Sequence, residues 1–265
     1  MISQNSFLPS ALKSFLEWRV WLYMGLQDIK ARFRRSAMGP LWILINLAMM
    51  VLGAGMVYGV LLKQPMAEFL PYLTCGLIVW GFLVSSFVDG GYAFVGSEGY
   101  IKQFSFPKQI YLFRVLVTLT VVMLVGVIAL AGTLLFFDRF KPMGWLYALP
   151  GLGILLVAGL GHITLSAYLS ARFRDLPHAM SGIFQVLFFV TPIMFPVAML
   201  KDRGLDFIYK YNPLYYLVDV IRFPILEGTF AVKQDYMFCA AYLTLLWLVC
   251  IVLGSKMDKK VVYML

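Results

Sequence analysis

Six stretches without a charged side chain constrain this chain more than any other feature of its sequence. Each is 20 to 30 residues long, and about 20 apolar residues suffice for a helix to cross a bilayer. Only 13% of the residues are charged, about half the share found in soluble domains. The sequence therefore predicts an all-α polytopic membrane protein that forms one transmembrane domain over residues 1–265. We expect six spans, at residues 36–62, 69–88, 115–137, 146–171, 178–199 and 236–255.

The positions of Lys and Arg predict the orientation of these spans. When successive loops are assigned to alternate sides, 14 of the 22 basic residues fall on the side that carries both termini. Cytoplasmic loops carry an excess of Lys and Arg, so we expect both termini in the cytoplasm. Orientation and anionic lipid headgroups explain the basic charge without nucleic acid. The residues before Lys13 contain no signal-peptide core, and no cleaved leader is expected.

Residues 10–35 predict an amphipathic helix that lies in the headgroup plane before the first span. Apolar residues recur at helical spacing from Leu12 to Phe33, and the segment ends in the basic run "KARFRR". Gly39 and Pro40 should then break the helix, because proline lacks a backbone donor and disfavours helical geometry in the residue before it. The break would let the chain turn into the membrane.

Two connections are unusual. The cytoplasmic connection, residues 89–111, holds a short amphipathic piece at Glu98–Phe106. The outer segment, residues 201–235, is too apolar for a solvated loop and too short in its apolar part for a span, so short re-entrant helices are expected. Its tyrosines have two interpretations, an aromatic belt at the headgroups or a surface on which sugar rings stack. Pro192 and Pro196 predict that the fifth span bends or ends early.

Several kinds of chemistry are disfavoured. The sequence has no Gly-Lys pair and therefore no nucleotide-binding P-loop, and its two histidines, His162 and His178, form no zinc motif. For His162, inside a span, a hydrogen bond between helices is favoured over proton transport. No carboxylate lies deep in a span, which argues against an ion-coupled carrier. We expect no enzymatic site, metal or cofactor in this chain.

Four motifs occur in order along about residues 28–228: "RFRRSAMGPLW", "EGYIKQFSFPKQI", "FRDLPHAMSGIFQVLFFVTPIMFP" and "YNPLYYLVDVIRFPILEG". Together they resemble the permease subunits of type-2 ABC exporters for polysaccharides, the Wzm-type transporters of O-antigen, capsule and teichoic acid. One departure is that Asn46 and Leu47 stand where a proline is expected in the first span. The missing proline removes the reason to expect a kink in the first span, and it does not affect the resemblance.

The resemblance implies an inner-membrane homodimer with two separate ATP-binding cassette subunits, which bind the ATP and magnesium. Its cargo would be an undecaprenyl-linked polysaccharide, O-antigen in the first instance. The resemblance also implies three groups of site residues. Those for coupling to the ATPase are Glu98, Gly99, Tyr100, Ile101, Lys102 and Phe104; those for the lipid pyrophosphate are Arg32, Arg34 and Arg35; those for the channel and outer gate are Tyr209, Tyr211, Asn212, Tyr215, Tyr216 and Arg222.

Two alternatives remain beside this one. A type-2 ABC exporter of teichoic acid, capsule, a drug or a lipid would share the topology. A membrane-embedded transferase would need carboxylates facing a cavity at the membrane surface, for which the cytoplasmic loops offer only Asp89, Glu98 and Asp175.

Overall fold

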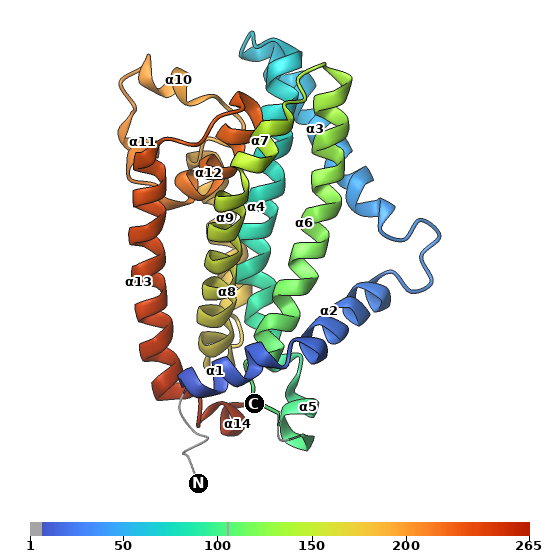
Figure 1. Cartoon of the computed structure of the whole chain (residues 1–265), viewed down its shortest axis with the longest axis vertical. Coiled ribbons are helices and arrows are strands. Elements are labelled where there is room, and N and C mark those ends of the chain that lie inside the picture. Colours follow the sequence, from blue (N-terminus) through green and yellow to red (C-terminus); the bar gives the residue numbers. More distant parts are fainter. Residues whose placement is uncertain (1–6, 105) are drawn as a thin grey trace.

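The computed structural model describes residues 7–104 and 106–265, which contain α-helices and no strand (Figure 1). The short helices lie at the two ends of a bundle of long ones. In chain order the helices are α1 Phe7–Leu16, α2 Trp18–Arg32, α3 Leu41–Leu61, α4 Met66–Val95, α5 Glu98–Gln103, α6 Ile110–Phe136, α7 Pro142–Tyr147, α8 Leu149–Arg172, α9 Leu176–Val190, α10 Val197–Lys201, α11 Phe207–Lys210, α12 Pro213–Glu227, α13 Lys233–Met257 and α14 Val261–Met264.

Five helical segments of the described chain are long and apolar enough to cross a membrane: α3, α4 with α5, α6, α7 with α8, and α13. Most run beyond the predicted spans, because charged residues such as Glu68, Asp89 and Arg114 lie inside the helices near their ends. The first span is shorter than predicted. It begins at Leu41 and not at residue 36, because the chain turns at Gly39, whose φ of 53° lies in the left-handed region.

The predicted fifth span, residues 178–199, is wrong in its extent. The helix found there, α9, has 15 residues, about 22 Å at 1.5 Å per residue, which is less than the hydrocarbon thickness of about 30 Å. It ends at Val190, and Thr191 is extended because Pro192 follows it. The early end expected from the prolines is therefore confirmed. Residues 191–196, which form turns and bends, complete the path from α9 to α10 at the other end of the bundle (Figure 1).

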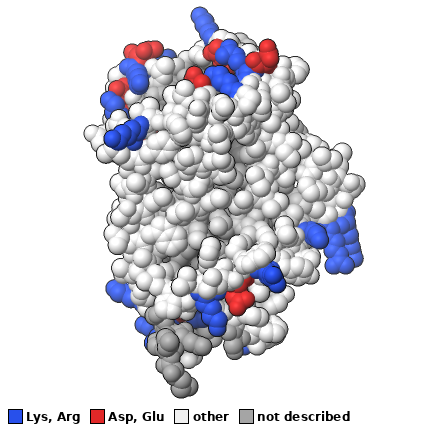
Figure 2. All heavy atoms as spheres, viewed as in Figure 1, with Lys and Arg blue, Asp and Glu red and all other residues white. Residues whose placement is uncertain are grey.

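The two ends of the bundle differ in what they carry. The α5 end holds α1, α5 and α14, and the α10 end holds α7, α10 and α11 (Figure 1). Charged side chains gather at both ends, with a broad uncharged band between them, and a further basic cluster covers the α2–α3 connection (Figure 2). This band is what a hydrocarbon core requires of the surface that it contacts. The cytoplasmic placement of the α5 end stays a prediction from the distribution of Lys and Arg.

The single interface helix predicted over residues 10–35 is wrong, because the structure has two helices separated at Glu17. The first, α1, packs on α13, where the Phe7 ring fits against Gly254. The second, α2, packs on α6, where a side chain in place of Gly25 would lie only 2.8 Å from Val117. Helix α1 also contacts α6, where the Phe15 ring lies 6.0 Å from the Phe113 ring, so the two helices share that partner and α1 reaches α13 in addition.

The core of the bundle is built around α4, which contacts α3, α6, α8, α9 and α12. Of the apolar stretch in α4–α5, 61% is buried, against 17% in α3. The α3 helix therefore exposes an apolar surface to lipid or to another chain.

His162 on α8 joins three helices. Its Nδ1 lies 3.1 Å from Ser86 Oγ on α4, and its Nε2 lies 2.6 Å from the Tyr242 hydroxyl on α13. Ser86 donates its own proton to the Leu83 carbonyl, so it accepts from Nδ1–H, which leaves Nε2 to accept from Tyr242. The predicted hydrogen bond between helices is confirmed.

Candidate functional site

The segment expected to couple to an ATPase forms a short helix at the α5 end. Ile101 is buried and anchors it, whereas Tyr100 and Phe104 are half exposed. Glu98 and Lys102, one turn apart, pair at 2.6 Å on the free surface, and no atom lies within 4 Å of where a Cβ would stand on Gly99. The six residues named from the sequence therefore lie together on one projecting element.

This helix is shorter than the predicted Glu98–Phe106. It ends at Gln103, and Phe104 is already extended, with φ −120° and ψ 139°. Pro107 disfavours helical geometry in Phe106, which places a stop close behind the helix. Residue 105 of the predicted piece lies outside the described residues. The rings of Phe104 and Phe106 remain exposed beyond the helix.

Helix α2 is fixed to the base of α5. Asp28 on α2 accepts two hydrogen bonds from Arg114, with Nε to Oδ2 at 2.5 Å and Nη2 to Oδ1 at 2.6 Å. A guanidinium that binds a carboxylate through two nitrogens is held in orientation as well as in place. Arg114 also reaches the Ser97 hydroxyl, next to α5, at 3.5 Å. A largely apolar groove of about 400 Å³ separates α2 from α5, with Met24, Tyr100 and Phe104 among its walls.

The three arginines expected to bind pyrophosphate lie where α2 ends and the chain turns toward α3. Arg32, Arg34 and Arg35 are all exposed, and none forms a salt bridge with a described residue. Arg35 has φ 67°, which directs the chain into the turn. Together these residues form a basic turn whose donors face solvent, a suitable arrangement for a phosphate ligand or for lipid headgroups.

At the α10 end, the break after α9 is held by side chains from two other helices. The carbonyl oxygen of Pro192 accepts a hydrogen bond from Arg222 Nη1 at 2.8 Å and lies 3.0 Å from the Tyr72 hydroxyl. That hydroxyl also lies 3.1 Å from the carbonyl oxygen of Phe195. Pro192 and Phe195 have no helical partner for these oxygens, so α4 and α12 supply the donors.

Arg222 is 1% exposed, and its charge is compensated on two sides. Its Nη2 donates to Asp219 at 3.1 Å, and its guanidinium carbon lies 4.0 Å from the centre of the Tyr72 ring, within cation–π range. We call Tyr72, Pro192, Asp219 and Arg222 the outer clamp. Sequence reasoning named Arg222 but missed Tyr72 on α4, whose role depends on residues far away in the chain.

The remaining residues expected at the gate lie around α12. Asn212 caps this helix by accepting from Leu214 N–H, and its Nδ2 donates to Thr191 Oγ1 at 2.8 Å. Tyr209, Tyr215 and Tyr216 are buried and Tyr211 is 85% exposed, so Tyr211 alone of the four presents a free ring.

Tyr215 contacts the rings of Tyr209 and Tyr216 edge to face, and Tyr216 stacks on Phe238 with ring centres 4.4 Å apart. Burial, with the nearby Asp219 carboxylate, raises the pKa of Tyr215, so its hydroxyl stays protonated and donates to Asp219 at 3.2 Å. The faces of these tyrosines are thus largely occupied by protein. A cavity of about 630 Å³ lies beside them, lined also by Asp206, Asp235 and Lys201.

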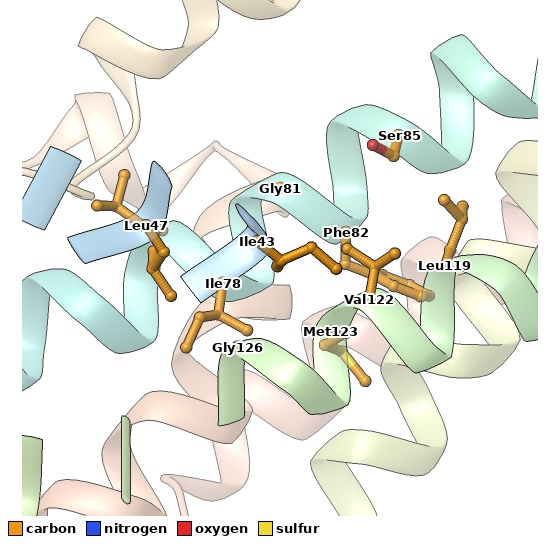
Figure 3. Close-up of a pocket in the computed structure, with 11 residues that line it drawn as sticks. Ile43, Leu47, Ile78, Gly81, Phe82, Ser85, Leu119, Val122, Met123 and Gly126 are labelled. Carbon is orange, nitrogen blue, oxygen red and sulfur yellow. The ribbon is translucent and has the colours of Figure 1, made fainter. Parts of the chain in front are cut away.

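A further pocket, smaller than the groove beside α5 and the cavity beside the tyrosines, lies between α3, α4 and α6 (Figure 3). It measures about 140 Å³, and Ser85 supplies the one polar side chain among its lining residues. Ile43 and Leu47 from α3 face Leu119 and Met123 from α6 across it. Such a lining suits an apolar chain and offers no group for catalysis.

No group of three or more His, Cys, Asp or Glu side chains in the described part of the chain could hold a metal ion. Of the three carboxylates available to a transferase, Glu98 pairs with Lys102 on the surface and Asp175 is exposed where α9 begins. The third, Asp89, lies within α4. The three are thus spread over separate elements.

Comparison with known proteins gives consistent matches. The family described as "ABC-2 type transporter" matches residues 19–226. Two proteins of Klebsiella pneumoniae named "O-antigen export system permease protein RfbA" are 25% and 24% identical to this chain, over 71% and 77% of its length and 73% and 78% of theirs. A protein of the same name from Myxococcus xanthus is 24% identical over 91% of this chain and 95% of its own.

Proposed function

The chain belongs to the ABC-2 type transporter family, and on that premise we propose that it is the permease that carries O-antigen across the inner membrane. As a family member it is a multi-pass subunit of an ABC exporter, and the ATP is hydrolysed by a separate ATP-binding cassette partner. O-antigen is the proposed cargo because three relatives with that printed function align over most of their length. We also propose that the O-antigen is attached to undecaprenyl pyrophosphate and that the exporter contains two copies of this chain.

The single observation that carries the mechanism is the geometry of α5. A buried Ile101 holds the helix in place while Tyr100 and Phe104 are half exposed, and α5 lies at one end of the bundle (Figure 1). Exposed aromatic side chains on a fixed support are typical anchors for a protein partner. Force applied to α5 by an ATPase would reach α2 through Arg114 and the core through Ile101 and α4.

The basic turn is proposed to receive the pyrophosphate of the lipid carrier. Three exposed guanidinium groups that form no salt bridge with a described residue support this role, because arginine offers paired N–H donors in a fixed geometry. The competing explanation is that these cations only orient the first span, for which lysine serves as well. The apolar surface of α3 supports contact with a second copy of the chain.

Deletion of the gene for this chain in its host tests the cargo. The proposal expects surface O-antigen to disappear while the lipid-linked polymer accumulates inside, with both effects reversed by a plasmid copy. Surface polymer is measured by lipopolysaccharide electrophoresis and antibody labelling of intact cells. Normal surface O-antigen together with loss of capsule, teichoic acid or drug resistance would assign the exporter a different cargo.

A further inference from the structure

The C-terminal segment, residues 258–265, turns back beneath the bundle after α13 and ends beside α5 (Figure 1). Val261 is fully buried and anchors it against the bundle. Tyr263, two residues later, is 91% exposed, more than any other large hydrophobic side chain in the described residues. A buried anchor beside a free ring is the arrangement that Ile101 and Tyr100 show on α5.

Hydrogen bonds fix this segment to the residues that follow α5. The Asp258 carboxylate accepts from Gln109 Nε2 at 3.0 Å and from the Tyr168 hydroxyl at 2.8 Å, and Lys108 donates to the Asp258 backbone carbonyl. Gln109 and Lys108 lie between α5 and α6. The C-terminal segment and the coupling helix are therefore attached to the same short stretch of chain.

The last residue is also held in place. Arg174, in the connection between α8 and α9, donates to the carbonyl oxygen of Leu265 at 3.2 Å. The α8–α9 connection and the chain end carry the exposed cations Arg172, Arg174, Lys256, Lys259 and Lys260, against the exposed acid Asp175, while Lys102 on α5 is paired with Glu98.

We infer that the C-terminal segment is a second docking element for the ATPase subunit, with Tyr263 inserting into an apolar site whose rim is acidic. The inference rests on the proposed function, because it takes α5 as the first docking element. Its location beside α5 makes one continuous surface, and the cations complement an acidic partner. A tail that anchors in lipid would turn several apolar side chains outward, whereas here Val261 faces the core and Lys259 and Lys260 precede the single free ring.

The test uses the full chain, co-purified with its ATP-binding cassette subunit in lipid nanodiscs, with photoreactive benzoylphenylalanine at position 263. We expect a cross-link to the ATPase subunit. Tyr263→Asp should weaken the complex about tenfold, the size of effect that loss of an aromatic anchor produces, while Tyr263→Phe should bind normally. Phe207→Asp is the matched control, because Phe207 is 60% exposed on α11, at the opposite end of the bundle.

The same probe at position 100 separates this inference from the proposed function. A cross-link from position 100, but only lipid or permease adducts from position 263 and normal affinity of Tyr263→Asp, would refute the second docking element and leave the coupling helix intact. Failure at both positions would refute the coupling assignment as well.

Discussion

At the α10 end of the bundle Tyr209, Tyr215 and Tyr216 are 7%, 8% and 5% exposed, whereas at the α5 end Tyr100 and Tyr263 are 50% and 91% exposed. The first group contacts the rings and hydrogen-bonding groups of the chain itself. The second group lies beside buried anchors, and the Tyr100 ring contacts the half-exposed ring of Phe104, with 6.3 Å between ring centres. The α10 end therefore holds a tyrosine cluster buried by the chain's own side chains, whereas the aromatic side chains of the α5 end leave a surface for a partner.

This difference predicts two kinds of mutational effect. Substitutions in the outer clamp remove bonds within the chain, so they should lower its stability whether or not a partner is present. Substitutions of exposed aromatics on α5 or α14 remove no internal contact of comparable size, so they should leave the isolated chain stable and act on the complex.

The largest effect on stability is expected for Arg222→Met. The variant leaves Asp219 without its partner and Pro192 without one donor, and loss of one member of a buried ion pair costs about 3 kcal/mol or more. The unfolding free energy of the purified chain in bicelles should fall by that amount. Lys210→Met is the matched control, because its salt bridge with Asp206 is exposed and should contribute less than about 1 kcal/mol. Equal stability of the two variants would contradict a structural role for the clamp.

A smaller loss is expected for Tyr72→Phe. The change removes the hydroxyl that reaches Pro192 and Phe195 but keeps the ring over Arg222, so the unfolding free energy should fall by about 1 to 2 kcal/mol. Tyr58→Phe, on α3, serves as the control, since Tyr58 makes no side-chain hydrogen bond with a described residue. If the two changes cost the same, the hydroxyl of Tyr72 does not hold the break after α9.

The smallest effect on stability is expected when Arg32, Arg34 and Arg35 are converted to Lys together. Charge is kept, so insertion, stability and assembly should match the wild type, while export should fall severalfold because lysine cannot bind pyrophosphate through paired donors. Surface glycan, membrane insertion and complex yield are measured on the same cells. Wild-type export would show that the basic turn serves only orientation and lipid binding.

The long helices could be predicted because an uncharged run of 20 residues in water has few alternatives to a membrane helix. Their ends could not, because a helix continues through charged residues once it leaves the hydrocarbon, as α4 does at Asp89. The bend at Glu17 was also missed. It depends on the contacts that α1 makes with α13 and α6 and that α2 makes with α6, which the periodicity of residues 10–35 does not record.

The candidate site, like the fold, could be predicted only in part. Short helices were expected within Glu98–Phe106 and within residues 201–235, and the structure has α5, α11 and α12 there, while the roles of these elements stay predictions. The side-chain pairs that hold these elements could not be predicted, because Asp28 and Arg114 are 86 residues apart in the sequence and Gln109 and Asp258 are 149 residues apart. Only the folded chain brings such residues together.

The central claim, that the α5 end receives the ATPase, is tested most directly by Tyr100→Asp combined with Phe104→Asp. Both side chains are half exposed, so the purified double variant should unfold like the wild type, while charge in an apolar contact should abolish permease-stimulated ATP hydrolysis and export. ATP turnover of the reconstituted complex is the measurement, with Phe207→Asp, an exposed residue on α11, as the control. Wild-type turnover and export by the stable double variant would contradict the account.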